Sequence, residues 1–199
     1  MTGTVLVIHT DGAARGNPGP AGAGWVVETM EGELVVEGYA YLGELTNNQA
    51  EYEALLLALD AVDPGPDTHI EVLADSELMV RQLNGQYRVK HADLRPRYEA
   101  ASRALARAAR ARVLHVPREE NARADELANR AIDMHFEASR EQGGQTVAGG
   151  PQGSLEESPG STGQDARGPF LRARGREAPL GVTESATENK PPGFREGRR

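Results

Sequence analysis

Four acidic residues of this chain occupy positions where an ordinary solvent-facing charge would be out of place. Asp11 directly follows the apolar segment VLVIHT, and Asp75 directly follows HIEVLA, so each comes at the end of an expected buried strand. A carboxylate at such a position loses hydration and needs a compensating donor, cation or metal ion. If the two strands are parallel neighbours, the two aspartates lie about 5 Å apart at one edge of the sheet.

The other two acids fall on the apolar faces of expected helices. At 100° per residue, Glu51 aligns with Ala54 and Ala58, and Asp125 aligns with Ala128. Each position has a simpler explanation when taken singly, because acidic residues stabilise the first turn of a helix. The apolar alignment instead favours a shared role with the two strand aspartates.

Four ionised carboxylates that crowd together repel one another unless divalent cations hold them. The chain has no cysteine and no cluster of histidines, and ligands that are all oxygen favour Mg²⁺ or Mn²⁺ over Zn²⁺. Two such ions about 4 Å apart promote the attack of water on a phosphodiester, because one activates the water and the other stabilises the leaving oxygen. We therefore expect a site that uses two metal ions for hydrolysis.

The hydrophobic pattern of residues 1–138 predicts the elements that must bring these acids together, in the order β-β-β-α-β-α-α-β-α. A helix capped by Thr46, with Gln49 completing a capping box, crosses from an antiparallel meander to a parallel fourth strand. The predicted fold class is α/β, with one five-stranded mixed sheet flanked by helices. We expect strands over 4–10, 21–30, 32–43, 69–74 and 112–116, and helices over 46–62, 76–85, 94–110 and 121–139, the last capped by Asn121.

Composition separates a core from a tail. Residues 141–199 contain 12 of the 23 glycines and 6 of the 12 prolines of this 199-residue chain, and no Trp or Tyr. Such a segment cannot bury enough apolar surface to offset its ordering entropy, so residues 139–199 are expected to be a disordered tail. The acidic and basic residues of the 141–199 segment balance, which leaves the net charge of −8 on residues 1–140.

That negative charge argues against a nucleic acid partner unless something overcomes the repulsion of phosphates. Two divalent ions would add four positive charges where a phosphate must sit. The N-terminus lacks a basic segment followed by a long apolar run, and no segment approaches membrane-spanning length. We expect a cytoplasmic monomer with no membrane association and no obligate protein partner.

Four segments, each with one of the acids, make the chain recognisable: TDGAARGNPGPAGAG, LTNNQAEYEALLLAL, ADSELMVRQLNG and VPREENARADELANRA. In this order they resemble ribonuclease H of type I, in its compact bacterial and archaeal form, over about the first 138 residues. The resemblance implies a ribonuclease H-like fold and an endoribonuclease that cuts the RNA strand of RNA/DNA hybrids with two Mg²⁺ ions, leaving 3′-hydroxyl and 5′-phosphate ends. It implies that the catalytic and metal-binding residues are Asp11, Glu51, Asp75 and Asp125.

The resemblance also implies contacts with the hybrid. The glycine-rich loop after Asp11 would lie against the minor groove, where 2′-hydroxyls distinguish RNA from DNA. Asn17 could equally be a turn former before Pro18. The implied contact residues are Gly12, Ala13, Arg15, Gly16, Asn17, Asn47, Asn48, Ser76 and Arg118.

The chain departs from the family pattern in three places. The loop PREENARAD lacks the histidine that many members carry before the last acid, and Arg118 is the nearest substitute. Glu77 stands where a glutamine often follows the third acid. The long basic protrusion is reduced to YRVKHADLRPR, whose basic residues either track a phosphate backbone or form a solvated loop. These basic residues are Arg88, Lys90, Arg95 and Arg97.

Three other functions remain open at this point. A non-catalytic hybrid-binding module would be expected to have lost at least one acid, and all four are present. An exonuclease of the acidic class usually begins with Asp-x-Glu, whereas this chain reads Asp11, Gly12, Ala13. A structural protein could act through the tail, where the arginines of RARGR are either solubilising or a source of nonspecific affinity for nucleic acid.

Overall fold

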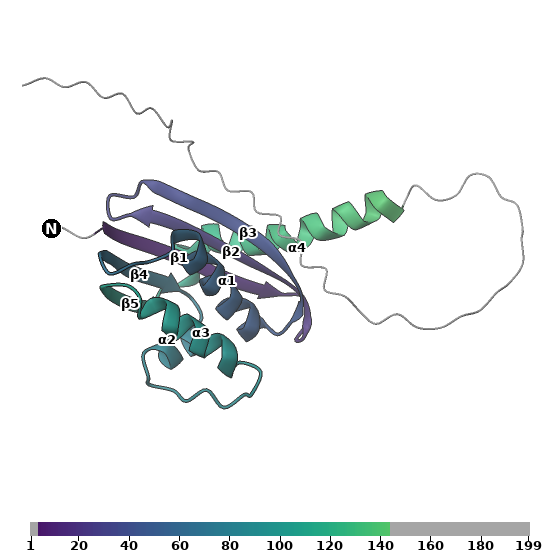
Figure 1. Cartoon of the computed structure of the whole chain (residues 1–199). Coiled ribbons are helices and arrows are strands. Elements are labelled where there is room, and N and C mark those ends of the chain that lie inside the picture. Colours follow the sequence, from purple (N-terminus) through teal and green to yellow (C-terminus); the bar gives the residue numbers. More distant parts are fainter. Residues whose placement is uncertain (1–3, 144–199) are drawn as a thin grey trace, which may run out of the picture.

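The computed structural model describes residues 4–143, which form one five-stranded mixed sheet flanked by helices, as predicted (Figure 1). The strand order is β3-β2-β1-β4-β5, with β1 to β3 antiparallel and with β4 and β5 parallel to β1. The elements are β1 (Thr4–Ala14), β2 (Gly19–Thr29), β3 (Leu34–Leu45), α1 (Asn47–Val62), β4 (Thr68–Ala74), α2 (Glu77–Leu83), α3 (Arg95–Leu105), β5 (Arg110–His115), the 3₁₀ turn η1 (Arg118–Asn121) and α4 (Ala122–Gly143).

The helices cover both faces of the sheet, with α1 on one side and α4 on the other (Figure 1). The main core lies beneath α1 and includes Trp25 of β2 and Leu55 of α1, both fully buried. The next residue of β2, Val26, points to the opposite face and packs against Leu127 of α4. The two faces therefore have separate apolar clusters, and each holds one of the helices that carry an acid.

The crossover helix α1 begins and ends as its sequence predicts. Thr46 caps it, because its hydroxyl accepts a hydrogen bond from the Gln49 N–H at 3.4 Å and its own N–H donates to Gln49 Oε1 at 2.9 Å. Asp63 adopts the left-handed conformation with φ of 41° and ends the helix before Pro64.

Several boundaries differ from the predictions. Residues 12–14, expected in an irregular loop, extend β1 and pair with residues 21–23 of β2, because small side chains fit this antiparallel ladder. The third helix ends at Leu105, since Arg110 already pairs with His69 in the sheet. Helix α4 continues to Gly143, past the boundary at residue 138, and the rest of the expected tail lies outside the described residues. Over residues 4–143, no helix has the length and apolar character needed to cross a membrane.

Two glycines allow α1 and α4 to rest directly on the sheet backbone. A Cβ atom at Gly12 would lie 2.1 Å from the backbone nitrogen of Glu51, and one at Gly24 would lie 2.2 Å from the carbonyl oxygen of Ala124. Both contacts involve backbone atoms, which cannot move aside as a flexible side chain can. Gly12 therefore fixes the distance between β1 and the turn of α1 that carries Glu51.

We predict that Gly12→Ala lowers the free energy of unfolding by about 3 kcal/mol or more, because the added methyl group overlaps the α1 backbone. Chemical denaturation measures this change. Gly65→Ala is the matched control, since a Cβ at Gly65 meets no atom within 4 Å, and its cost is expected to stay within about 0.5 kcal/mol. Equal effects of the two substitutions would contradict the close contact.

Candidate active site

The candidate site begins where the parallel pairing of β1 and β4 stops. Thr10 and Ala74 are the last paired residues, so Asp11 and Asp75 follow at the carboxyl end of this pair. Asp11 lies within β1 rather than at its end, because β1 continues along β2 after β4 has finished. The predicted proximity of the two aspartates therefore arises from a difference in strand length.

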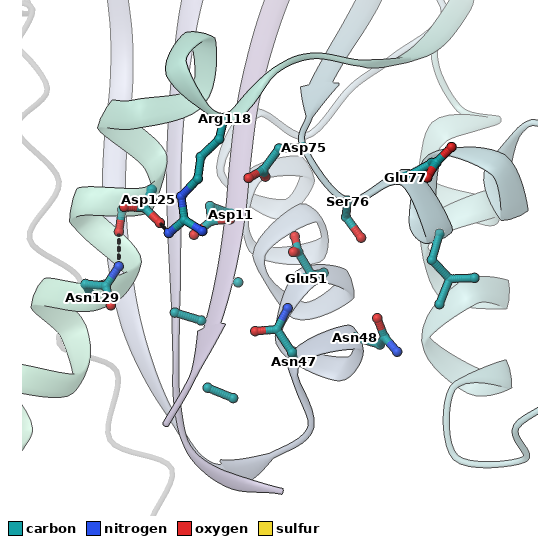
Figure 2. Close-up of a pocket in the computed structure, with 14 residues that line it drawn as sticks. Asp11, Asn47, Asn48, Glu51, Asp75, Ser76, Glu77, Arg118, Asp125 and Asn129 are labelled. Carbon is teal, nitrogen blue, oxygen red and sulfur yellow. Dashed lines mark hydrogen bonds and ion pairs between the residues drawn. The ribbon is translucent and has the colours of Figure 1, made fainter. Parts of the chain in front are cut away.

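Glu51 joins the two aspartates from the first turns of α1 (Figure 2). One carboxylate oxygen from each of Asp11, Glu51 and Asp75 lies within 4.8 Å of the other two. Glu51 is only 5% exposed, and its Oε2 has no hydrogen-bond partner among the described residues. A buried carboxylate oxygen without a donor is a position that a cation can satisfy, and the three acids fit a hard divalent ion such as Mg²⁺ or Mn²⁺.

Asp125 reaches the same cavity from α4, on the other side of the sheet. Its carboxylate forms an ion pair with the guanidinium of Arg118, and its backbone carbonyl accepts a hydrogen bond from Asn129 Nδ2 at 3.0 Å. Figure 2 shows Arg118 extending from η1 toward Asp125, beside Asp11 and Asp75. All four predicted acids thus line one cavity of about 520 Å³.

Burial and mutual repulsion strongly perturb Asp11 and Glu51. Burial raises the pKa of Asp11 from 3.8 to about 7, with further contributions from the negative charges of Asp75 and Asp125. Burial likewise raises the pKa of Glu51 well above its usual range, and the charges of Asp11 and Asp75 add to this shift. The positive charge of Arg118 opposes both shifts. The cavity therefore concentrates negative potential that a divalent cation would relieve.

The buried side-chain amide of Asn121 positions Asp75, a role that the sequence analysis did not predict. Asn121, predicted to cap the last helix, instead donates through Nδ2 to the Thr10 carbonyl at 2.9 Å and to Asp75 Oδ1 at 3.0 Å. Its Oδ1 accepts no hydrogen bond from any residue between 4 and 143, so the side chain does not cap α4. Asn121 thereby joins β1, η1 and the segment after β4 at a single point.

The expected substrate contacts divide into two groups. Gly12, Ala13, Asn47, Asn48, Ser76 and Arg118 line the cavity together with the acids. Arg15, Gly16 and Asn17 do not line it. The guanidinium of Arg15 pairs with Asp133 at 2.7 Å, whereas Asn17 Oδ1 accepts a hydrogen bond from the N–H of Asn47 at 3.2 Å. Asn17 therefore supports the start of α1 at the rim.

Sequence reasoning did not assign four further residues that line the cavity, namely Ala14, Glu77, Leu78 and Asn129. Asn129 was detectable, because it lies one helical turn after Asp125 on the same face. Glu77 points away from the acids in Figure 2 and pairs with Arg81 at 2.5 Å. In the reduced basic segment, Arg97 is held by Glu53 at 2.8 Å, whereas Arg88, Lys90 and Arg95 are exposed.

Comparisons with known proteins support one family. Residues 9–131 match the family model described as reverse transcriptase-like. The chain is 46% identical over 125 residues to ribonuclease HI of Halobacterium salinarum, covering 63% of this chain and 63% of that relative. It is 35% identical over 140 residues to ribonuclease H of Cereibacter sphaeroides, covering 62% of this chain and 91% of that relative.

A solved structure, LC11-RNase H1 in complex with RNA/DNA hybrid, matches with 44% identity and a TM-score of 0.62, covering 66% of this chain and 99% of that one. The chain spans less than two thirds of the length of the first curated relatives, 63% of the Halobacterium protein and 35% of mycobacterial ones.

The raised pKa of Asp11 predicts how stability depends on pH without metal. The folded protein retains a proton on Asp11 between pH 3.8 and about 7 that the unfolded chain has released, so raising the pH through this window destabilises the fold. We expect Asp11→Asn to be more stable than the wild type by on the order of 2 to 4 kcal/mol at pH 8 in EDTA. The difference should vanish near pH 4, as urea unfolding at both pH values can measure. A constant difference across the range would contradict the assignment.

Asn121→Ala should weaken both the fold and the metal site, because it removes one buried and one partly buried hydrogen bond, the second of which holds Asp75. We expect a loss of about 2 to 4 kcal/mol in the free energy of unfolding and a fall of about tenfold or more in Mn²⁺ affinity. The control is Asn84→Ala, which removes a hydrogen bond of the same kind away from the acids. In it, the Asn84 side-chain amide donates to the Val113 carbonyl at 2.9 Å. Asn84→Ala should cost stability alone, and calorimetric Mn²⁺ titration separates the two outcomes.

Proposed function

This chain belongs to the type I ribonuclease H family, and we propose that it hydrolyses the RNA strand of RNA/DNA hybrids with two divalent metal ions. The observation that carries the proposal is the convergence of Asp11, Glu51, Asp75 and Asp125 on one cavity. Three of these acids offer oxygens within 4.8 Å of one another, which suits a hard cation. The products would have 3′-hydroxyl and 5′-phosphate ends.

Asp11, Glu51 and Asp75 would hold the first ion, and Asp125 would contribute to the second. When bound, Mg²⁺ or Mn²⁺ lowers the pKa of a water molecule and stabilises the charge that develops on the leaving oxygen. The chain's own contribution is to keep four acidic side chains in place despite their repulsion. Backbone packing at Gly12 positions Glu51, and the Asn121 amide positions Asp75.

The rim of the cavity would bind the hybrid. Gly12 and Ala13 line the cavity, and the short side chain of Ala13 lets a sugar edge approach the backbone of β1 closely. Asn47 and Asn48 at the start of α1 present amide groups that suit 2′-hydroxyls and base edges of a shallow minor groove. The hybrid bound to the 44% identical LC11-RNase H1 supports this substrate class.

Arg118 occupies the region where many family members have a histidine. We propose that it serves this protein as a phosphate-binding cation beside Asp125. A guanidinium at the cavity attracts a phosphodiester to a chain whose net charge is −8.

Cleavage of a labelled RNA/DNA hybrid tests the proposal. We expect cleavage with Mg²⁺ or Mn²⁺, none in EDTA, and none of single-stranded RNA under the same conditions. Asp11→Asn should lower the rate by at least about 100-fold with the fold retained, because a first-ion ligand loses its charge.

The matched control is Asp60→Asn, which neutralises an exposed acid on α1 outside the cavity and should cleave at the wild-type rate. Hybrid cleavage that persists in EDTA, or that survives Asp11→Asn unchanged, would overturn the proposed function.

A further inference from the structure

The four acids of the cavity are not equivalent, because one of them already has a cation. Asp125 is paired with the Arg118 guanidinium, whereas Asp11, Glu51 and Asp75 form a compact group from which Asp125 is absent. A metal ion that binds Asp125 must compete with this ion pair. Within the described part of the chain, no basic side chain forms an ion pair with the other three acids, so an ion that binds them displaces none.

The two partners of this ion pair differ in how firmly they are held. The Arg118 side chain is 70% exposed, whereas that of Asp125 is 25% exposed and projects from a regular helix. At the other end of η1, Asn121 is fully buried and bonded to both Thr10 and Asp75. The turn is therefore anchored at one end, and the arginine side chain at its other end is free to swing toward solvent.

The charges of the cavity also favour an exchange. Four ionised carboxylates carry four negative charges, and one divalent ion with the guanidinium compensates three of them. A second divalent ion then brings more positive charge than the four carboxylates require. A phosphodiester restores the balance of charge. Its two non-bridging oxygens accept hydrogen bonds from a guanidinium as well as the oxygens of a carboxylate do.

We propose that Arg118 is an internal counter-ion that holds Asp125 until a nucleic acid phosphate draws it away, so that the second metal ion binds only with the substrate. This inference rests on the proposed function for the identity of the phosphate. Arg118 is a positioning residue in this scheme, because it controls the availability of Asp125. The first ion remains bound by Asp11, Glu51 and Asp75 throughout.

Metal titration without nucleic acid tests the counter-ion role. Calorimetry with Mn²⁺ should show one ion bound to the wild type over a concentration range in which Arg118→Ala binds two. We expect the variant to bind the second ion about three- to tenfold more tightly than the wild type, since an exposed ion pair is removed. First-ion affinity should change less.

Arg123→Ala is the matched control, because Arg123 is another surface arginine, 45% exposed, at the start of α4, and it pairs with Glu37 and Glu126 instead. It should bind Mn²⁺ as the wild type does. Thermal unfolding verifies that each variant is folded. Unchanged second-ion affinity in Arg118→Ala, or two equally tight ions in the wild type, would overturn the proposal.

The exchange itself can be followed by NMR of the arginine Nε–Hε groups in EDTA, where the proposed cleavage cannot occur. Addition of an RNA/DNA hybrid should shift the Arg118 signal, assigned from its loss in Arg118→Ala, and leave the Arg123 signal in place. A bound hybrid that leaves the Arg118 signal unmoved would refute the exchange. The proposed function fails separately, if the wild type does not cleave the hybrid when metal is present. In that case the Mn²⁺ titration without nucleic acid still tests whether Arg118 is a counter-ion of Asp125.

Discussion

Repulsion among buried carboxylates is the constraint on which the rest of this structure depends. Asp11 and Glu51 are each only 5% exposed, and both have raised pKa values because water is excluded and other acids are near. A polypeptide would not adopt this arrangement for its own stability. The fold must therefore hold the acids with contacts that do not yield, and its hydrophobic clusters on both faces of the sheet supply the required rigidity.

The contacts that resist this repulsion are mostly made by backbone rather than by long side chains. Helix α1 rests on β1 at Gly12, and α4 rests on β2 at Gly24, so neither helix can move closer to the sheet, and the apolar clusters beneath them oppose their moving away. The Asn121 side chain adds a further contact, between the Thr10 carbonyl and Asp75. Arg118 differs from all of these, because it balances charge without restraining the backbone.

The sequence alone predicts those features that depend on periodicity. The apolar alignment of Glu51 and the capping box at Thr46 follow from local patterns, and the structure contains both. The parallel pairing before Asp75 follows from the general rule for a crossover through a helix, and it is also present. Features that depend on a distant partner escape such reasoning. Asn121 has every local property of a helix cap, and only the proximity of Thr10 and Asp75 directs its amide elsewhere. Residues 12–14 have the composition of a loop, and only the antiparallel neighbour β2 makes them strand.

The termination of β4 at Ala74, while β1 continues to Ala14, gives the site its distinctive place in the molecule. The acids gather at a step in the sheet, and they come from chain positions more than a hundred residues apart. A cation held by Asp11, Glu51 and Asp75 would join β1, α1 and the end of β4, and a second ion that binds Asp125 would add the final helix. Bound metal would therefore stabilise the native topology as well as take part in the chemistry, because the complete site exists only once the last helix has docked.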